Sequence, residues 1–188
     1  MDCINPQGNG FQNYVWDTQA LNQLASDDDM IILCKSAYDV GHRYYITTVQ
    51  ERELVGVPDR TMKYNSSSAW RNPQGQTFEV MKSLCFCRIS CIALLYLNFW
   101  LLDGSMRILE DSGPRIDMFN EIYNNNNHHK RDATIAEATV YHNCFLISND
   151  KRLRNKTNKY FPGTAITYKE YKDRILALIA KEANARAD

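Results

Sequence analysis

The sequence predicts an α/β domain of three layers, in which a central, mostly parallel sheet of four or five strands lies between two layers of helices. Short apolar runs with β-branched and aromatic residues alternate along the chain with segments of helical periodicity. One of these runs, Cys144–Ser148, has four successive apolar residues, which is typical of a strand that helices cover on both faces. The chain has 188 residues, of which 44% are hydrophobic, and this is enough for one domain with a sizeable core.

The first part of the chain contains two strand–helix units with a further helix between them. An apolar run at Tyr14–Trp16 predicts a strand, and a helix with one apolar face begins at Asp17. Residues 26–41 predict the intervening helix, because acidic residues fill its first turn and a glycine ends it. A β-rich run at Tyr44–Thr47 and a helix at Val49–Leu54 form the second unit.

The middle of the chain is less regular. Residues 58–80 are polar and predict a loop. The apolar segment 90–104 is shorter than the ~20 residues that a membrane span needs, and Asn98 interrupts it, so we expect a buried helix or a pair of strands. A strand at Met106–Leu109 and a helix from about Pro114 follow.

The last third of the chain returns to regular alternation. Residues 132–143 have helical spacing, with Asn143 as a left-handed cap, and they lead into the apolar run that ends at Ser148. We expect a polar linker over residues 151–163, a short strand at Thr164–Tyr168 and an amphipathic helix over residues 169–188.

Composition limits the classes of function. Lysine plus arginine equals aspartate plus glutamate at 22 each, so a contact with nucleic acid would require a local basic patch. The six cysteines lack C-x-x-C spacing and the N-terminus does not resemble a signal peptide, which together predict buried thiols of a cytoplasmic protein. The cluster at Cys85–Cys91 is expected to pack in the core, and the Asn/His run at about 124–131 to form a flexible loop that binds no metal.

Acidic residues follow two of the predicted strands. Asp17 comes after the first strand and Asp150 after the run that ends at Ser148, so both lie at carboxyl ends, where ligands bind to parallel sheets. Asp132 and Glu53 begin or lie early in helices that could reach the same edge. Four converging carboxylates would repel one another, and Mg²⁺ or Mn²⁺ would relieve that repulsion and activate a water against a phosphodiester.

Four motifs resemble those of the PIN-domain family of metal-dependent ribonucleases, which includes the VapC-type toxins of toxin–antitoxin systems. They are WDTQAL, ITTVQERELVGV, DATIAEATVYHNCFLISNDKRL and GTAITYKEY. The resemblance runs in order from about residue 14 to 171 and leaves residues 58–112 unmatched. It implies one PIN-like domain over residues 1–188.

The resemblance also assigns the site. The family's four acids fall on Asp17, Glu53, Asp132 and Asp150, which would be the catalytic and metal-binding residues, with Glu51 as the alternative to Glu53. The residue two after the first acid is Gln19 here, where the family commonly has asparagine. The neighbours implied to orient the acids or to contact RNA are Thr18, Ser148, Asn149, Lys151, Arg152 and Arg154.

The implied activity is hydrolysis of RNA phosphodiester bonds with one or two Mg²⁺ or Mn²⁺ ions. A member of the toxin class would have a small antitoxin protein as its partner, and homodimers are common in the family. The alternative is a PIN-like RNA- or protein-binding module that has lost its chemistry. The residues taken singly also allow structural roles, with Asp132 as the N-cap of its helix and Lys151–Arg154 as a solvated turn.

Overall fold

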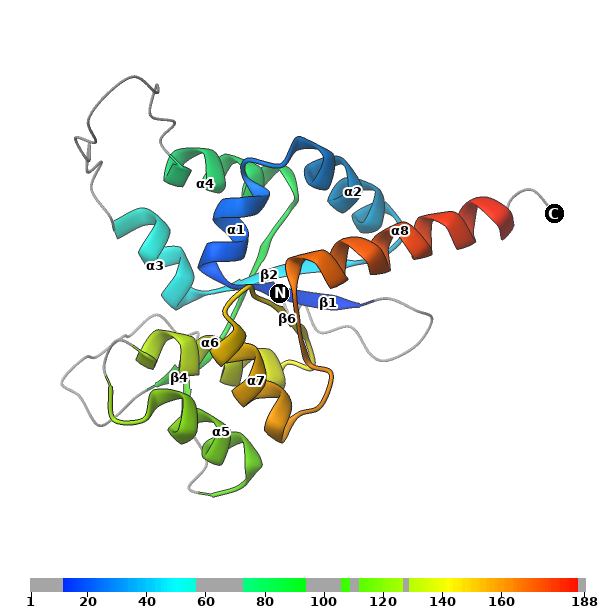
Figure 1. Cartoon of the computed structure of the whole chain (residues 1–188). Helices are drawn as coiled ribbons and strands as arrows, with labels where there is room; N and C mark the ends of the chain where they lie inside the picture. Colours follow the sequence, from blue (N-terminus) through cyan, green and yellow to red (C-terminus); the bar gives the residue numbers. More distant parts are fainter. Residues whose placement is uncertain (1–11, 57–72, 94–105, 109–111, 127–128, 186–188) are drawn as a thin grey trace.

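The computed structural model describes residues 12–56, 73–93, 106–108, 112–126 and 129–185. Five parallel strands form the central sheet, and helices cover both of its faces (Figure 1), which confirms the predicted three-layer α/β architecture. The strand order across the sheet is β3 (Cys87–Ile89), β2 (Arg43–Thr47), β1 (Asn13–Trp16), β6 (Phe145–Ile147) and β7 (Ala165–Ile166). β1 is therefore the middle strand, between β2 and β6.

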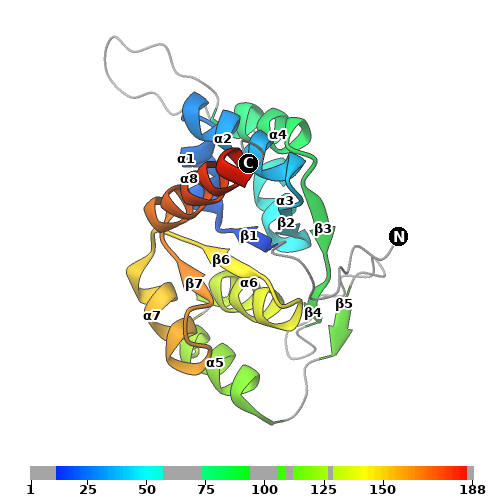
Figure 2. The same ribbon diagram turned by 90° about the vertical axis from the view of Figure 1, so that its right-hand side faces the viewer.

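Two layers of helices sandwich the sheet, as the view turned by 90° shows (Figure 2). One layer contains α1 (Thr18–Leu24), α2 (Asp28–Asp39), α4 (Pro73–Ser83) and α8 (Tyr168–Ala185). The other contains α5 (Pro114–Tyr123), α6 (Lys130–Tyr141) and α7 (Lys151–Tyr160). α3 (Thr48–Gly56) follows β2 directly and sends side chains into both layers.

Alternation along β1 fills the two cores. The side chains of Tyr14 and Trp16 enter an aromatic core on the α1/α8 side, whereas Val15 enters the core on the α6 side. In the aromatic core, Trp16 meets Tyr171 edge to face with ring centroids 4.9 Å apart, and the Tyr171 hydroxyl lies 2.9 Å from that of Tyr44. This packing fixes the carboxyl end of β1, which is the edge that carries Asp17.

A separate sheet of two parallel strands, β4 (Cys91–Ala93) and β5 (Met106–Ile108), lies outside the central sheet. The strand predicted at Met106–Leu109 is thus present at Met106–Ile108, but it pairs with β4. Residues 94–104, the rest of the apolar segment, lie outside the described residues. In the part of the chain that is described, no helix has the length and apolarity to cross a membrane.

Two helices occupy segments for which the sequence predicted no regular structure. The predicted linker at 151–163 is wrong, because Lys151–Tyr160 form α7, capped by Asp150 and anchored by Leu153 and Thr157 one turn apart. The predicted loop at 58–80 is wrong from Pro73 onward, where α4 begins with proline at its first position. Residues 57–72 lie outside the described part of the chain.

Smaller predictions near the ends of elements have mixed outcomes. Asn143 adopts the predicted left-handed conformation with φ 52°, which ends α6. The N-cap assignment of Asp132 is wrong, because α6 begins at Lys130 and His129 holds the cap position. The Asn/His loop is therefore shorter than predicted, and its residues 127–128 are not described.

The cysteine prediction holds for three residues. Among the described cysteines, Cys34, Cys91 and Cys144 are buried free thiols, as predicted. Cys85 is exposed, so the predicted core packing of the Cys85–Cys91 cluster is wrong at that position. The cause is a left-handed turn at Cys85, with φ 53°, that joins α4 to β3 at the surface. Cys3 lies outside the described residues.

Candidate active site

Asp17 lies at the carboxyl end of β1, where it begins α1 from the N-cap position. Its backbone N–H donates to the carbonyl of Ile147, the last residue of β6, over 2.8 Å. Its side chain is 6% exposed, and the hydroxyl of Ser148 donates to Asp17 Oδ2 over 3.0 Å. The ends of β1 and β6 therefore place one buried carboxylate at the sheet edge that the sequence predicted.

The charge of Asp17 is unfavourable in this position. Burial raises the pKa of Asp17 to about 6, and the negative charges of Asp132 and Asp150 act in the same direction. The hydrogen bond from Ser148 and the backbone amide of Thr18 oppose this rise. The three carboxylates are thus close enough for their charges to interact, although they come from distant parts of the chain.

Asp150 is the N-cap of α7, and its Oδ1 accepts from the backbone N–H groups of Arg152 over 2.7 Å and Leu153 over 3.2 Å. Its own N–H donates to Ser148 Oγ over 3.0 Å. Ser148 is fully buried and contacts both acids, since its hydroxyl accepts from Asp150 and donates to Asp17. The cap uses Oδ1 of the Asp150 carboxylate and leaves Oδ2 for other contacts.

Asp132 faces Asp150 from α6, and Arg152 bridges the two. Arg152 Nη2 lies 2.6 Å from Asp132 Oδ2 and 3.6 Å from Asp150 Oδ2. His129 Nδ1 is 3.9 Å from the same oxygen of Asp132. Burial raises the pKa of Asp132, and the positive charge of Arg152 partly offsets that rise. The structure therefore brings together three of the four predicted acids.

The fourth predicted acid, Glu53, lies in α3, and its side chain is outside the described part of the structure. The alternative, Glu51, forms an ion pair with Arg88 of β3, with Oε1 and Nη2 2.6 Å apart. Glu51 thus has a partner on the β3 side of α3. Glu53 remains the prediction for the fourth position.

The start of α3 is fixed by Gln50, which is not among the predicted site residues. Gln50 is fully buried, and its Nε2 donates to the carbonyl of Trp16, the last residue of β1. Its Oε1 accepts from the backbone N–H of Thr47 over 2.9 Å, while the Gln50 N–H donates to Thr47 Oγ1 over 3.3 Å. This is a capping box, and the T-x-x-Q spacing ahead of the helix was the signal that could have identified it.

The remaining predicted residues have different surroundings. Asn149 Nδ2 donates to Gln23 Oε1 over 2.6 Å, and Asn149 Oδ1 accepts from the backbone N–H of Tyr168 over 3.3 Å. Asn149 therefore ties α1 to α8 beside the site. Lys151 is exposed in the first turn of α7, which corrects the prediction of a solvated turn, and Arg154 donates to the carbonyl of Ser148 over 2.8 Å.

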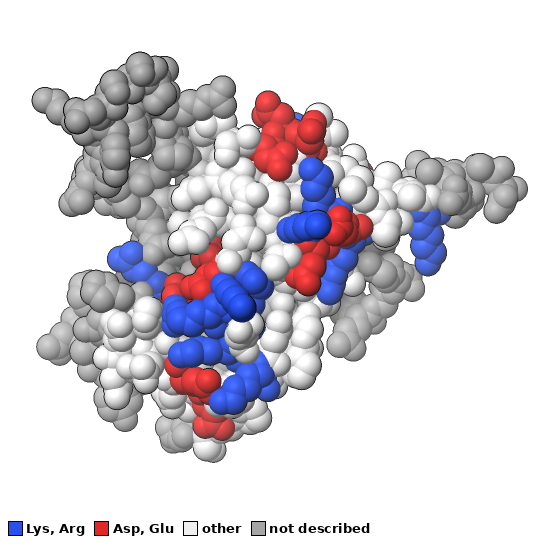
Figure 3. All heavy atoms as spheres, in the orientation of Figure 1, with Lys and Arg blue, Asp and Glu red and all other residues white. Residues whose placement is uncertain are grey.

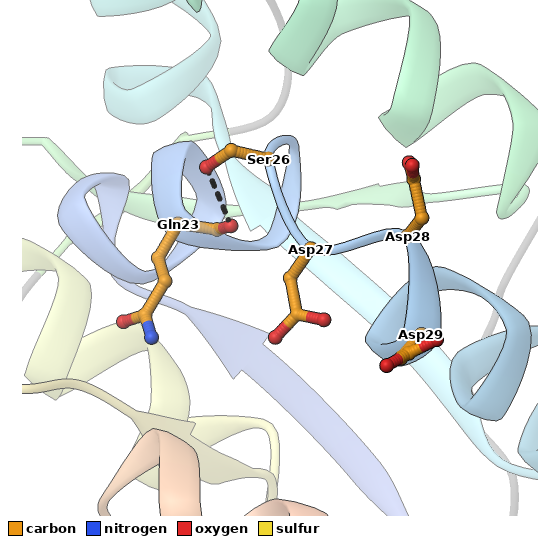
Figure 4. Close-up of a pocket in the computed structure, with 5 residues that line it drawn as sticks. All are labelled: Gln23, Ser26, Asp27, Asp28 and Asp29. Carbon is orange, nitrogen blue, oxygen red and sulfur yellow. Dashed lines mark hydrogen bonds between the residues drawn. The ribbon is translucent and has the colours of Figure 1, made fainter.

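The surface around the site is divided by charge (Figure 3). Basic side chains gather over α7, interspersed with acids, whereas an acidic group marks the start of α2. That acidic group lines an open pocket, which contains Gln23, Ser26, Asp27, Asp28 and Asp29 (Figure 4). Because Gln23 also binds Asn149, the pocket borders the site on the side away from α7.

The three carboxylates supply hard oxygen donors of the kind that Mg²⁺ and Mn²⁺ prefer. Among the described side chains, no three His, Cys, Asp or Glu residues stand close enough to share one ion. The Arg152 guanidinium lies between Asp132 and Asp150, and Ser148 engages one oxygen of Asp17. The carboxylate oxygens are thus suitable ligands for Mg²⁺ or Mn²⁺. The Arg152 guanidinium lies between two of these carboxylates, those of Asp132 and Asp150.

No known family model matches the chain, and no curated protein is significantly similar to it. Solved structures with a similar fold include the following two. The crystal structure of PAE2754 from Pyrobaculum aerophilum is 18% identical with a TM-score of 0.46, over 88% of this chain and 96% of that chain. The crystal structure of VapBC2 from Rickettsia felis, bound to a DNA fragment from its promoter, is 12% identical with a TM-score of 0.40. The similarity covers 83% of this chain and 98% of that chain. The assignment of function therefore depends on this chain's own residues.

Proposed function

We propose that the chain is a metal-dependent endoribonuclease of the PIN type. The observation that carries the proposal is the convergence of Asp17, Asp132 and Asp150 at one edge of the parallel sheet. The Ser148 hydroxyl joins two of these acids. A buried carboxylate with a raised pKa beside two further acids, at the carboxyl ends of strands, is typical of a functional site.

Each residue of this site has a chemical role in the proposal. Asp17, Asp132, Asp150 and Glu53 would hold Mg²⁺ or Mn²⁺, which supplies a water of lowered pKa and a counter-charge for the phosphodiester. Ser148 keeps Asp17 oriented by donating to its Oδ2. Thr18 supports the ionised form of Asp17 through its backbone amide.

The charge distribution indicates how RNA would approach. Lys151 is exposed next to Asp150 and offers a positive charge to the phosphate backbone. On the opposite side, Asp27, Asp28 and Asp29 would repel that backbone. We therefore propose that the strand of RNA lies over the first turn of α7 and avoids the start of α2.

The resemblance of four sequence motifs to the PIN-domain family supports proposals about location, partner and oligomeric state. The proposal places the protein in the cytoplasm as the toxin of a toxin–antitoxin pair, with a small antitoxin protein as partner, and as a homodimer. A short reading frame next to the gene that encodes an antitoxin would support this assignment over a housekeeping nuclease.

A second function has one observation in its favour. The Arg152 guanidinium pairs with Asp132 and Asp150, as expected if these acids have become structural in a PIN-like RNA- or protein-binding module. The two functions differ in whether RNA is cleaved or only bound.

The test is an RNA cleavage assay with Mn²⁺, with EDTA, and with the variants Asp17→Asn and Asp28→Asn. Asp28 is an exposed acid at the start of α2 and serves as the matched control. We expect cleavage by the wild type and Asp28→Asn with Mn²⁺, and none with EDTA or Asp17→Asn. Cleavage that persists unchanged in Asp17→Asn would exclude the proposed site. Binding without cleavage under every condition would favour the second function.

A further inference from the structure

Arg152 occupies the place of a cation between two acids of the site. We infer that Arg152 is an internal counter-ion that a divalent metal ion must displace from Asp132 and Asp150, so that this residue lowers the affinity of the protein for the metal ion. The inference rests on the proposed function, because it concerns the same carboxylates. It adds a role for a residue that the motif resemblance assigned to RNA.

The guanidinium is held by three oxygen atoms. Nη2 lies 2.6 Å from Asp132 Oδ2 and 3.6 Å from Asp150 Oδ2, and Nη1 donates to the carbonyl of Ile122 over 3.4 Å. The backbone N–H of the same residue donates to Asp150 Oδ1 over 2.7 Å. Arg152 thus contacts Asp150 through both its backbone N–H and its guanidinium. The backbone hydrogen bond of the α7 cap keeps the guanidinium near the two acids.

A metal ion and this guanidinium cannot use the same oxygens together. Mg²⁺ binds oxygen at about 2.0–2.1 Å, so an ion that bridged Asp132 Oδ2 and Asp150 Oδ2 would lie in the space that Arg152 Nη2 fills, 2.6 Å and 3.6 Å from these oxygens. Two cations beside one carboxylate also repel each other. Binding of the ion to Asp132 and Asp150 therefore requires the Arg152 side chain to rotate away.

The side chain has room to make this movement. The Arg152 side chain is 33% exposed, and the side chains of Asp132 and Asp150 are 27% and 32% exposed. The released guanidinium would enter water and would not have to be buried elsewhere. Since exposed ion pairs contribute little, the competition should change metal affinity by a few-fold and should not abolish binding.

The experiment compares Mn²⁺ binding to the full, metal-stripped chain by isothermal titration calorimetry. The variants are Arg152→Ala, Arg152→Lys and the control Lys159→Ala, which removes an equal charge from the far end of the same helix, where Lys159 pairs with Glu121. We expect Arg152→Ala to bind Mn²⁺ at least about threefold more tightly than the wild type. Arg152→Lys should lie between them, since lysine lacks the planar fork of arginine, and Lys159→Ala should match the wild type.

The outcomes separate this inference from the proposed function. If the wild type binds Mn²⁺ and Arg152→Ala binds it equally or more weakly, the counter-ion role is wrong and the metal site stands. If neither the wild type nor Arg152→Ala binds Mn²⁺, the metal site itself is wrong. Should Arg152→Ala fail to fold, as judged by circular dichroism, Arg152→Lys carries the test, and an unchanged affinity in that variant would overturn the inference. A larger Mn²⁺-induced rise in Tm for Arg152→Ala than for the wild type would support it independently.

Discussion

The hydroxyl of Ser148 donates a hydrogen bond to Asp17 over 3.0 Å, although 131 positions of sequence separate the two residues. The contact forms because β1 and β6 are parallel neighbours whose carboxyl ends coincide, with Trp16 opposite Ile147. The residue after each strand end thus becomes part of one site. The same serine accepts from Asp150, so a single buried hydroxyl sets the orientation of two acids.

Replacement of Ser148 by alanine should change the pH profile of the proposed activity. The Ser148 hydrogen bond lowers the pKa of Asp17, so its loss should raise that pKa further above the value of about 6. Protons compete with the metal ion for Asp17, so the acidic limb of the rate–pH profile is expected to move to higher pH, with a loss of about 1 kcal/mol in stability. Ser83→Ala, at an exposed position in α4, is the control. An acidic limb that stays in place would show that Asp17 does not govern it.

The stability of the metal-free protein should also report the raised pKa of Asp17. The folded-state pKa of about 6 exceeds the ordinary value of 3.8, so the folded state binds more protons between these pH values. Stability from this group is therefore complete below about pH 4 and is lost as the pH rises through 6. The loss amounts to about 2 to 3 kcal/mol.

Asp17→Asn removes this titration while it keeps an oxygen that can accept from Ser148. We expect Asp17→Asn to be more stable than the wild type at pH 8 in EDTA, and the difference should shrink at pH 4. Urea unfolding at the two pH values measures both differences. Equal free energies of unfolding for Asp17→Asn and the wild type at pH 8 would mean that burial of the ionised Asp17 does not destabilise the protein.

Asp150 combines a helix cap with a site carboxylate, and two substitutions separate these roles. Asp150→Asn keeps a good N-cap and loses the charge, so activity should fall sharply with little change in stability. Asp150→Ala loses both the cap and the charge, so its free energy of unfolding should be lower by a further ~1 kcal/mol. Urea unfolding and RNA cleavage of both variants measure the two effects.

Asp27 provides the matching control, because it caps α2 by accepting from the Met30 N–H over 3.0 Å. Asp27→Ala should lose at least as much stability as Asp150→Ala loses through its cap, since Asp27 also accepts from the Tyr168 hydroxyl. It should keep its activity. If Asp150→Asn is as active as the wild type, the carboxylate of Asp150 has no role beyond the cap.

Gln50 should be needed for both stability and activity. Gln50→Leu leaves the Trp16 carbonyl and the Thr47 N–H buried without this partner, which should cost about 1 to 3 kcal/mol in the free energy of unfolding. Cleavage should also fall at temperatures where the variant is folded, because the first turn of α3 is no longer fixed to the end of β1. Gln19→Leu, at an exposed position in α1, is the control for stability. Unaltered activity in a destabilised Gln50→Leu would limit Gln50 to a structural role.

The positions of Asp17 and Asp150 were predictable because each follows a short apolar strand, and parallel strands bring their carboxyl ends to one edge. The pairing of Arg152 was not predictable in the same way. The segment after Asp150 has so few apolar residues that its helical period rests on Leu153 and Thr157 alone. A linker would have left Arg152 without a fixed position, whereas α7 aims it at two acids.

In the middle of the chain, a strand could be predicted from the sequence but its partner strand could not. The strand at Met106–Ile108 was visible as an apolar run, but its partner is a matter of long-range pairing, and it joins β4 in a separate sheet. Gln50 was overlooked because glutamine in a helix is unremarkable by itself. Its significance comes from the Trp16 carbonyl, 34 positions earlier.

The order of the strands has a consequence for a chain that is still being synthesised. β1 is made first but occupies the centre of the sheet, and its neighbour β6 is made only after more than a hundred further residues. Until the segment through Arg152 has left the ribosome, Asp17 has neither Ser148 nor Asp132 and Asp150 beside it. The growing chain therefore carries no assembled site near the translating ribosome, and the site appears only when the last third of the protein has folded.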